Sequence, residues 1–510
     1  MLFLPVSLQM YVEGFDLQRL SNLVIMVRSF VQISTLFSAL LKEIVVSCSF
    51  SGMDKNLSSA MCLLFSLSFK QILKRNPKEL YQLLCFGNRE AAVLLECDLP
   101  DITERIYTLA KQIKDRFYGN RIVMFAPLYL SNYCVNGCVY CPYHYKNKHI
   151  ARKKLTQEEV RKEAIALQDM GHKRLALEAG EDPVNNPIEY ILECIDTIYS
   201  IKHKNGEIRR VNVNIAATTV ENYRKLKDAG IGTYILFQET YHKKTYEELH
   251  PTGPKSNYAY HTEAMDRAME GGIDDVGLGV LFGLNMYRYD FVGLLMHAEH
   301  LEAAQGVGPH TISVPRICPA DDIDVNEFSN AIPDSIFEKI VALIRIAVPY
   351  TGMIISTRES QKVREKVLQL GVSQISGGSR TSVGGYVEPE PEEENSAQFD
   401  ISDHRSLDEI VNWLTEMGFI PSFCTACYRE GRTGDRFMSL LKSGQISNCC
   451  QPNALMTLKE YIMDYASEET KKNAEALIEK EIENVTNPKV KDIAKERLKM
   501  IEEGKRDFRF

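Results

Sequence analysis

Two groups of three cysteines are the residues of this chain best suited to chemistry. The first group has the spacing C-x3-C-x2-C and consists of Cys134, Cys138 and Cys141. The second has the spacing C-x2-C-x22-C and consists of Cys424, Cys427 and Cys450. A four-iron cluster normally takes four cysteine ligands, one for each iron. Three ligands leave one iron open to a small molecule, much as a catalytic zinc keeps one open position. The spacing therefore predicts two clusters that both take part in chemistry.

Zinc binding and disulfide bonding are the alternative interpretations of these cysteines. Structural zinc takes four ligands, and only His144 or His149 lies near the first group as a fourth. In the second group Cys449 offers an alternative spacing, and a zinc ribbon or a redox pair stays open there. Disulfide scaffolds are short and cysteine-dense, whereas this chain has 13 cysteines in 510 residues. We therefore expect a reduced, anaerobic or cytosol-like compartment.

The composition is that of a globular protein, with 45% apolar and 25% charged residues. The net charge of −8 offers no basic field for nucleic acid, so no nucleic-acid partner is expected. Residues 1–70 are apolar but irregular, and Arg28, Lys42 and Glu43 interrupt them. Because no clean run of about 20 apolar residues appears, we expect no stable insertion into a membrane.

From about residue 98 onward, strand patterns alternate with helix patterns. The expected strands are 122–130, 173–179, 211–217, 233–239, 275–284, 310–317, 353–359 and 373–378. Capping boxes are expected at Thr156 with Glu159 and at Thr218 with Glu221. Asp98 is expected to cap the helix before the first strand.

Eight such units over about 260 residues match the size of a TIM-type (β/α)8 barrel. An open doubly wound sheet is the alternative, but no glycine-rich phosphate loop follows the first strand. The first cysteine group comes directly after that strand. This order places it at the carboxyl-terminal mouth, where the active sites of such barrels lie.

The first cysteine motif resembles that of the radical S-adenosylmethionine (radical SAM) superfamily. Gly180 and Glu181, after the second strand, resemble the GE motif that meets the methionine amino group in this family. With the aromatic Tyr140, they are the expected cofactor-binding residues. The resemblance implies that the open iron binds SAM and that reduction yields a 5′-deoxyadenosyl radical. The cofactor supplies the difficult chemistry, and the protein positions it.

Further segments narrow the resemblance to one family. They are HPTGPKSNY, GGIDDVGLGVLFGL, GVGPHTISVPR and CTACYREGRTGDRFM…CCQPNAL. From about residue 72 onward the chain looks like the tyrosine lyase that matures FeFe-hydrogenase. The related tyrosine lyase of thiamine biosynthesis (2-iminoacetate synthase) shares the first motif but lacks the second cysteine group.

The patterns along the chain, together with the resemblance, predict a division into four parts. We expect an irregular N-terminal extension at 1–71 and a radical SAM barrel with leading helices at 72–386. These are followed by an acidic linker at 387–400 and a mainly helical C-terminal domain at 401–510. The C-terminal domain is expected to carry the auxiliary iron–sulfur cluster.

By this resemblance, L-tyrosine is cleaved to p-cresol and dehydroglycine at the first cluster. The small fragment moves through the barrel and becomes carbon monoxide and cyanide on an extra iron at the second cluster. This iron leaves as a synthon for the hydrogenase H-cluster. The alternative function is that of 2-iminoacetate synthase, which stops at dehydroglycine. A non-catalytic iron–sulfur carrier is a further alternative.

The implied partners are a low-potential electron donor of ferredoxin or flavodoxin type and the other FeFe-hydrogenase maturation proteins. The implied location is the cytoplasm, or the matrix of a hydrogenosome or another organelle in a eukaryote.

The resemblance also implies a histidine ligand for the extra iron, and we predict His310, because it opens a strand at the far end of the barrel. His250, His297 and His300 are lesser candidates. For the tyrosine carboxylate we predict Arg358 and Arg316, which each end a strand and whose guanidinium fork matches a carboxylate. Ser379 is expected to add a hydroxyl.

Overall fold

The computed structural model describes residues 87–388 and 395–510. The predicted extension at 1–71 and residues 389–394 of the predicted linker lie outside the described residues.

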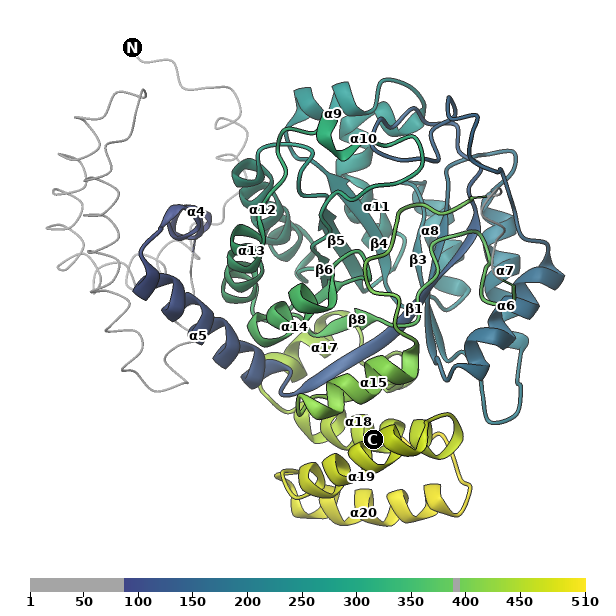
Figure 1. Ribbon diagram of the computed structural model, residues 1–510, viewed down its shortest axis with the longest axis vertical. Helices are drawn as coiled ribbons and strands as arrows, with labels where there is room; N and C mark the ends of the chain where they lie inside the picture. The colour runs from purple at the N-terminus through teal and green to yellow at the C-terminus, as the bar shows by residue number, and fades with distance from the viewer. Residues whose placement is uncertain (1–86, 389–394) are drawn as a thin grey trace, which may run out of the picture. The chain divides into compact units, whose positions relative to one another are not determined.

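Eight parallel strands close into a barrel surrounded by helices, which confirms the predicted TIM-type fold (Figure 1). Each strand pairs with its neighbours in chain order, and β1 pairs with both β2 and β8 to close the ring. The strands are β1 (Arg121–Ser131), β2 (Arg174–Ala179), β3 (Arg210–Asn214), β4 (Tyr234–Glu239), β5 (Val276–Val280), β6 (Thr311–Ser313), β7 (Gly352–Ile355) and β8 (Gln374–Ser376). All eight overlap the predicted segments, although some of them, such as β5 and β6, end well before the predicted bounds.

Helices connect the strands and pack outside them. They are α6 (Gln157–Asp169), α7 (Ile188–Ser200), α8 (Val220–Asp228), α9 (Lys243–Leu249), α10 (Tyr258–Thr262), α11 (Ala264–Glu270), α12 (Tyr287–Gln305), α13 (Asp334–Ala347) and α14 (Gln361–Leu370). Two short 3₁₀ helices, η2 (Pro254–Ser256) and η3 (Val325–Glu327), lie in the loops. Two helices precede the barrel, α4 (Asn88–Glu96) and α5 (Pro100–Phe117).

The capping box of Thr156 with Glu159 is confirmed, and it starts the helix that follows the first cysteine loop. The box predicted at Thr218 is wrong. Thr219 is the cap of α8, because its hydroxyl accepts the backbone N–H of Asn222. The predicted cap Asp98 is also wrong, because α5 starts one residue later, with Leu99 at the cap position and no side-chain hydrogen bond there.

A ninth strand, β9 (Ile420–Ser422), pairs in parallel with the first residues of β1 and was not predicted. β1 is eleven residues long, and at about 3.3 Å per residue it spans roughly 35 Å. Cys134 follows its carboxyl end, whereas β9, at its amino end, leads directly to Cys424. The two cysteine groups are therefore held at opposite ends of one strand.

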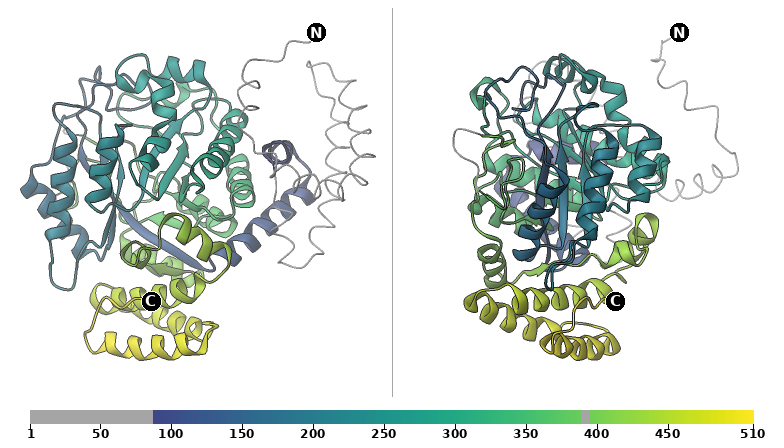
Figure 2. Two further views of the ribbon diagram at one scale, coloured as in Figure 1. Left: turned by 180° about the vertical axis from the view of Figure 1, so that it is seen from behind. Right: turned by 90° about the vertical axis from the view of Figure 1, so that its right-hand side faces the viewer.

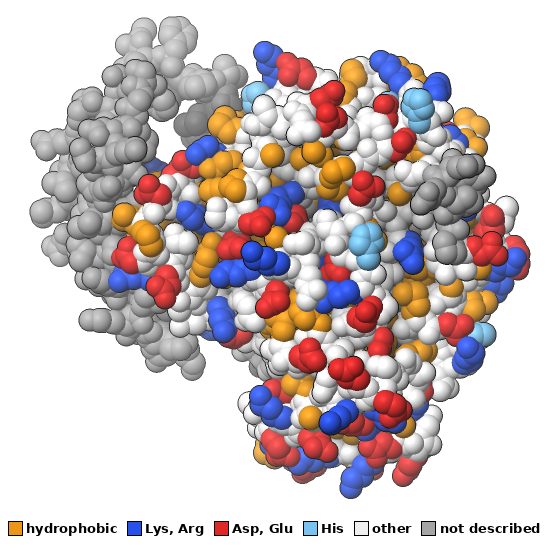
Figure 3. Space-filling model, viewed as in Figure 1, with side chains coloured by type: hydrophobic (Ala, Val, Ile, Leu, Met, Phe, Trp, Pro, Cys, Tyr) orange, Lys and Arg blue, Asp and Glu red, His pale blue; other side chains and the backbone are white. Residues whose placement is uncertain are grey.

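The end of the chain is a helical layer beneath the amino ends of the strands (Figure 2). It comprises α15 (Leu407–Glu416), α16 (Ala426–Arg429), α17 (Gly434–Lys442), α18 (Ser447–Asp464), α19 (Glu468–Ile482) and α20 (Pro488–Glu502). α18 packs on β9, α19 and α20. In Figure 3 acidic and basic side chains are interspersed on this lower lobe, as a solvated surface requires. A helix able to cross a membrane is not found in the part of the chain that the structure describes.

Candidate functional sites at the two ends of the barrel

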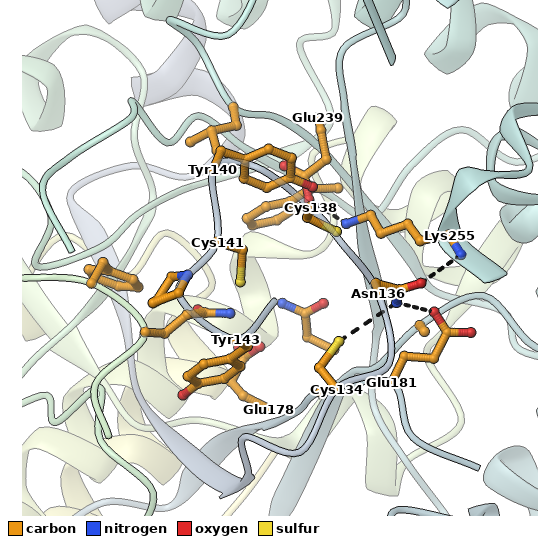
Figure 4. A pocket seen from close by; sticks show the side chains of 18 of the residues that line it. Cys134, Asn136, Cys138, Tyr140, Cys141, Tyr143, Glu178, Glu181, Glu239 and Lys255 are labelled. Carbon is orange, nitrogen blue, oxygen red and sulfur yellow. Dashed lines mark hydrogen bonds and ion pairs between the residues drawn. The ribbon is translucent and has the colours of Figure 1, made fainter. Parts of the chain in front are cut away.

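The first cysteine group lies on the loop after β1 and faces a cavity of about 150 Å³. Its three side chains come from one short loop and turn toward a common space (Figure 4). The carboxyl ends of β2, β3 and β4 line the same cavity with Glu178, Asn214 and Glu239. The predicted position at the carboxyl-terminal mouth of the barrel is therefore correct.

Gly180 allows the end of β2 to approach this loop closely. A Cβ atom at Gly180 would lie 2.4 Å from the carbonyl oxygen of Tyr133 and 3.1 Å from the Cβ of Cys134. The next residue, Glu181, accepts a hydrogen bond of 2.6 Å from the Asn136 side chain, whose nitrogen lies 3.7 Å from the Cys134 sulfur. The two predicted cofactor-binding residues thus adjoin the cysteine loop, and Glu181 faces the cavity.

The donor set fits an iron–sulfur cluster. Cys134, Cys138 and Cys141 are all free thiols. Burial raises the pKa of all three, and that of Cys141 reaches about 12, so the thiols are neutral until a metal replaces their protons. Within 87–388 and 395–510, no three His, Cys, Asp or Glu side chains converge on a point that would hold a single metal ion. An iron–sulfur cluster does not need its ligands to converge on one point, because each cysteine around the shared cavity binds a separate iron.

A charged pair beside the cysteine loop was not predicted (Figure 4). Lys255 and Glu239 form a buried ion pair of 2.8 Å, and both line the cavity. Glu239 has a φ of +67°, and the pairing of β4 with β5 shifts register just before it. A non-glycine residue in the left-handed region is strained, and such strain concentrates at functional sites.

Tyr140, the third predicted cofactor-binding residue, lies in the cysteine loop between Cys138 and Cys141. Its hydroxyl lies 2.7 Å from Nε2 of His250, whose Nδ1 lies 2.7 Å from the carbonyl oxygen of Tyr246. Because Nδ1 donates to a carbonyl, Nε2 accepts the hydrogen bond of Tyr140. Burial lowers the pKa of His250 to about 3, which keeps the imidazole neutral. His250 therefore orients Tyr140 beside the first cysteine group.

A second cavity of about 100 Å³ continues into the barrel interior. Glu178, Asn214, Phe237 and Arg358 line both cavities, so they mark the junction between the two. Burial raises the pKa of Glu178 well above its usual range and favours the neutral acid. Sequence reasoning missed Glu178 and Asn214. The available signal was a polar side chain near the end of an otherwise apolar strand.

The predicted carboxylate-binding residues have different surroundings. Arg358 lies at the junction, stacks on Phe399 with its guanidinium carbon 3.6 Å from the ring centroid, and donates to the Cys318 sulfur. Within the described ranges, no carboxylate lies within ion-pair distance of Arg358.

Arg316, in contrast, pairs with Glu359 through two nitrogens and with Asp334 at 2.8 Å, and it lines neither cavity. Ser379 is buried, its hydroxyl has no partner in the described structure, and it also lines neither cavity.

The second cysteine group lines a third cavity, of about 100 Å³, at the amino ends of the strands. Cys424, Cys427 and Cys450 line it together with His310, whereas Cys449 does not. A hydrogen bond with the Cys450 thiol lowers the pKa of Cys427 to about 6 and raises that of Cys450. All three sulfur-bearing side chains line one small cavity, which suits them to a common cluster.

His310 is aimed into this third cavity between two polar groups. Its Nδ1 lies 3.4 Å from the buried carboxylate of Asp275, and its Nε2 lies 3.4 Å from the hydroxyl of Tyr428. Burial lowers the pKa of His310, which favours the neutral imidazole that binds metals. A carboxylate at Nδ1 is the usual outer partner of a metal-binding histidine, so Asp275 suits the role of orienting Nε2 toward the cavity.

Two arginines complete the third cavity, and sequence reasoning missed both. Arg121 and Arg174 open β1 and β2, are at least nine-tenths buried, and face the cysteines. Arg174 donates to the carbonyl oxygen of Cys424, and its guanidinium carbon lies 5.4 Å from the ring centroid of Tyr428. The described lining contains no acidic side chain. The cavity is therefore suited to an anionic cluster and its cargo.

The remaining candidate histidines lie elsewhere. His297 and His300 are on α12, where His300 pairs with Asp266, and they line a groove of about 780 Å³ on the outside of the barrel. Neither reaches the cysteine groups.

Two family models match the barrel and the segment that follows it. The family model "Radical SAM superfamily" matches residues 128–296, and the model "Biotin and Thiamin Synthesis associated domain" matches residues 313–420. Among curated proteins, the 2-iminoacetate synthase of Salmonella typhimurium is 29% identical over 329 residues, which is 64% of this chain and 84% of that protein.

Two solved structures match over a larger part of the chain. A crystal structure of HydG, a maturase of the FeFe-hydrogenase, is 56% identical with a TM-score of 0.81, covering 87% of this chain and 98% of that one. HydG from Carboxydothermus hydrogenoformans is 39% identical with a TM-score of 0.71, covering 88% of this chain and 100% of that one. With a radical SAM domain, a (β/α)8 barrel and this extent of identity, the chain belongs to the HydG family of FeFe-hydrogenase maturases.

Proposed function

We propose that this enzyme cleaves L-tyrosine to p-cresol and dehydroglycine at the mouth of the barrel. It then converts the small fragment to carbon monoxide and cyanide on an iron at the other end. The observation that carries the proposal is the pair of three-cysteine cavities at opposite ends of β1. A tyrosine lyase of thiamine biosynthesis requires only the first of them.

In this proposal Cys134, Cys138 and Cys141 hold the first cluster. When bound, the cluster and SAM supply the 5′-deoxyadenosyl radical that starts the cleavage. Glu181 lies where the methionine amino group is expected. Asn136 donates a hydrogen bond to the Glu181 carboxylate, which lines the cavity. The closed walls of the barrel keep bulk water from a reactive intermediate.

We assign the tyrosine carboxylate to Arg358. Its guanidinium has no ion pair within the described residues, it is fixed by stacking on Phe399, and it lies where the first cavity meets the barrel interior. A carboxylate held there leaves the side chain of tyrosine in the space that Glu178 and Asn214 line. The neutral Glu178 adds a polar contact without repelling an anionic substrate.

The interior cavity gives the released fragment a route toward the second site. It reaches from Glu178 to Phe125 and Ser376, and the next inward positions, Val123 and Gln374, line the third cavity. There Cys424, Cys427 and Cys450 hold the auxiliary cluster, and His310 holds the iron that is exported as cargo. Carbon monoxide and cyanide are small enough to form within a cavity of about 100 Å³.

Anaerobic turnover of the reconstituted protein with tyrosine, SAM and a reductant tests the proposal. We expect p-cresol together with carbon monoxide and cyanide. p-Cresol without either diatomic product would favour 2-iminoacetate synthase, the alternative that the 29% identical relative supports. Iron without any deoxyadenosine would contradict both and leave an iron–sulfur carrier.

A further inference from the structure

The outer side of the first cysteine loop is exposed and apolar. Val135 and Val139 alternate with the cysteines and are 37% and 45% exposed, while Cys138 between them is only 6% exposed. Tyr145, just after the loop, is 39% exposed. Apolar side chains exposed next to one another mark contact surfaces for partners, and these three lie on one short segment of the chain.

Backbone hydrogen bonds join the neighbouring loops into one surface around these residues. The N–H of Val135 donates to the carbonyl of Glu181, and the N–H of Val139 donates to that of Leu249. The N–H of Tyr145 donates to the carbonyl of Asn136, inside the cysteine loop. The surface is therefore held in place and does not depend on a bound partner for its shape.

The charge of this surface differs in sign from that of the whole chain. Residues 142–157 contain five Lys or Arg residues and no Asp or Glu, although the chain carries a net charge of −8. Lys146 and Lys148 are exposed directly beside Tyr145. Arg152 is used internally, since it donates to the carbonyls of Asn132 and Tyr143. Two acids contact this segment: Asp322 pairs with His144, and Asp321 accepts a hydrogen bond from Asn147.

We propose that the cluster-loop patch, made of Val135, Val139, Tyr145, Lys146 and Lys148, docks a small acidic protein that donates one electron to the first cluster. This rests on the proposed function, which requires that cluster to be reduced. Reactants occupy the cavity side of the cysteines, so an electron carrier approaches from the outer side, where Val135 and Val139 are exposed. The carrier loses one electron, the cluster gains it, and no bond forms or breaks. Apolar contacts hold the complex, and the lysines attract an acidic partner and speed its association.

The test measures how fast the first cluster is reduced in anaerobic stopped-flow absorbance experiments. The protein is the full chain carrying only the first cluster, obtained with Cys424→Ala, and the probe is an acidic flavodoxin in its hydroquinone form. We expect the double variant Lys146→Glu/Lys148→Glu to lower the second-order rate constant at least tenfold at low ionic strength. Salt screens exposed charges. We therefore also expect added salt to lower the rate constant of the protein with both lysines toward that of the double variant.

The matched control is Lys472→Glu/Lys480→Glu, which reverses two exposed charges on α19, far from the loop. It should leave the rate constant unchanged. Dithionite should reduce all three proteins equally, which shows that the cluster is intact in each. Equal rates for both charge-reversed variants with flavodoxin would overturn the docking surface. A cluster that not even dithionite reduces would instead contradict the proposed function.

Discussion

At the residue scale, two arginines that end neighbouring strands of the barrel have different surroundings. Arg316 follows β6 and is neutralised by Glu359 and Asp334, whereas Arg358 follows β7 and faces the junction of two cavities. The sequence shows both as basic residues at strand ends. Only the tertiary partners distinguish an ion pair from a substrate-binding group.

We therefore expect Arg358→Lys to raise the KM for tyrosine by about ten- to a hundredfold, because one point charge replaces a planar fork and a charged hydrogen bond contributes about 1.5–3 kcal/mol. The matched variant Arg316→Lys should lower thermal stability and leave KM within about twofold. Steady-state p-cresol formation measures both. Equal KM values in the two variants would contradict the assignment of Arg358.

His310 and Asp275 make the second prediction at this scale. We expect His310→Ala to retain p-cresol formation and to lose the auxiliary iron that carries the diatomic ligands. Asp275→Asn should weaken iron binding by about 10- to 100-fold, the usual effect of removing an outer partner of a metal-binding histidine.

Iron analysis after gel filtration and titration with Fe²⁺ measure this binding. His297→Ala is the control, because His297 lies in a separate groove on the outside of the barrel. Unchanged iron binding in Asp275→Asn would show that Asp275 does not orient His310.

At the scale of elements, one buried carboxylate fixes the segment that leads from the barrel to the helical layer. Asp403 accepts hydrogen bonds from Arg364 and Arg405, and its backbone N–H donates to the carbonyl of Thr357, next to Arg358. Burial alone would raise its pKa, but these two arginines lower it to about 2.

We expect Asp403→Asn to lower the free energy of unfolding by about 3 kcal/mol at pH 7, because it leaves the fully buried Arg364 without a counter-charge. The folded-state pKa is depressed, so this stability is complete above the unfolded pKa of about 3.9 and is lost as the pH falls toward 2. Denaturant unfolding between pH 7 and pH 3.5 measures the free energy of unfolding of both proteins. The difference between variant and wild type should stay constant down to about pH 4 and narrow below it. The exposed Asp435→Asn is the control, and a difference that grows on acidification would refute the argument.

The strands of the barrel could be predicted because apolar and β-branched residues gather between turn residues, most clearly at 122–130. β9 could not, since three residues with a central proline carry no periodicity, and its existence depends on pairing with the extended start of β1. The cysteines were predictable from spacing, and the position of His310 from its place before a strand. Arg121 and Arg174 gain their role only when β9 brings Cys424 beneath the barrel, and no local pattern contains that information.

At the scale of the whole molecule, the barrel holds the two cysteine groups at its opposite ends. The first cysteine group is placed by the carboxyl ends of the strands, and the second by the amino ends and the helical layer. One set of parallel strands thus fixes both, and the interior cavity lies between them. We therefore expect the cleavage of tyrosine to proceed without the auxiliary site, and the auxiliary site to depend on the fragment that cleavage supplies.

Product analysis of Cys134→Ala and Cys424→Ala, under anaerobic turnover with tyrosine and SAM, tests this division of labour most directly. The account predicts that Cys134→Ala forms no p-cresol, and that Cys424→Ala still forms p-cresol but no iron-bound carbon monoxide and cyanide. Loss of p-cresol in both variants, with both proteins folded by circular dichroism, would contradict two separable centres.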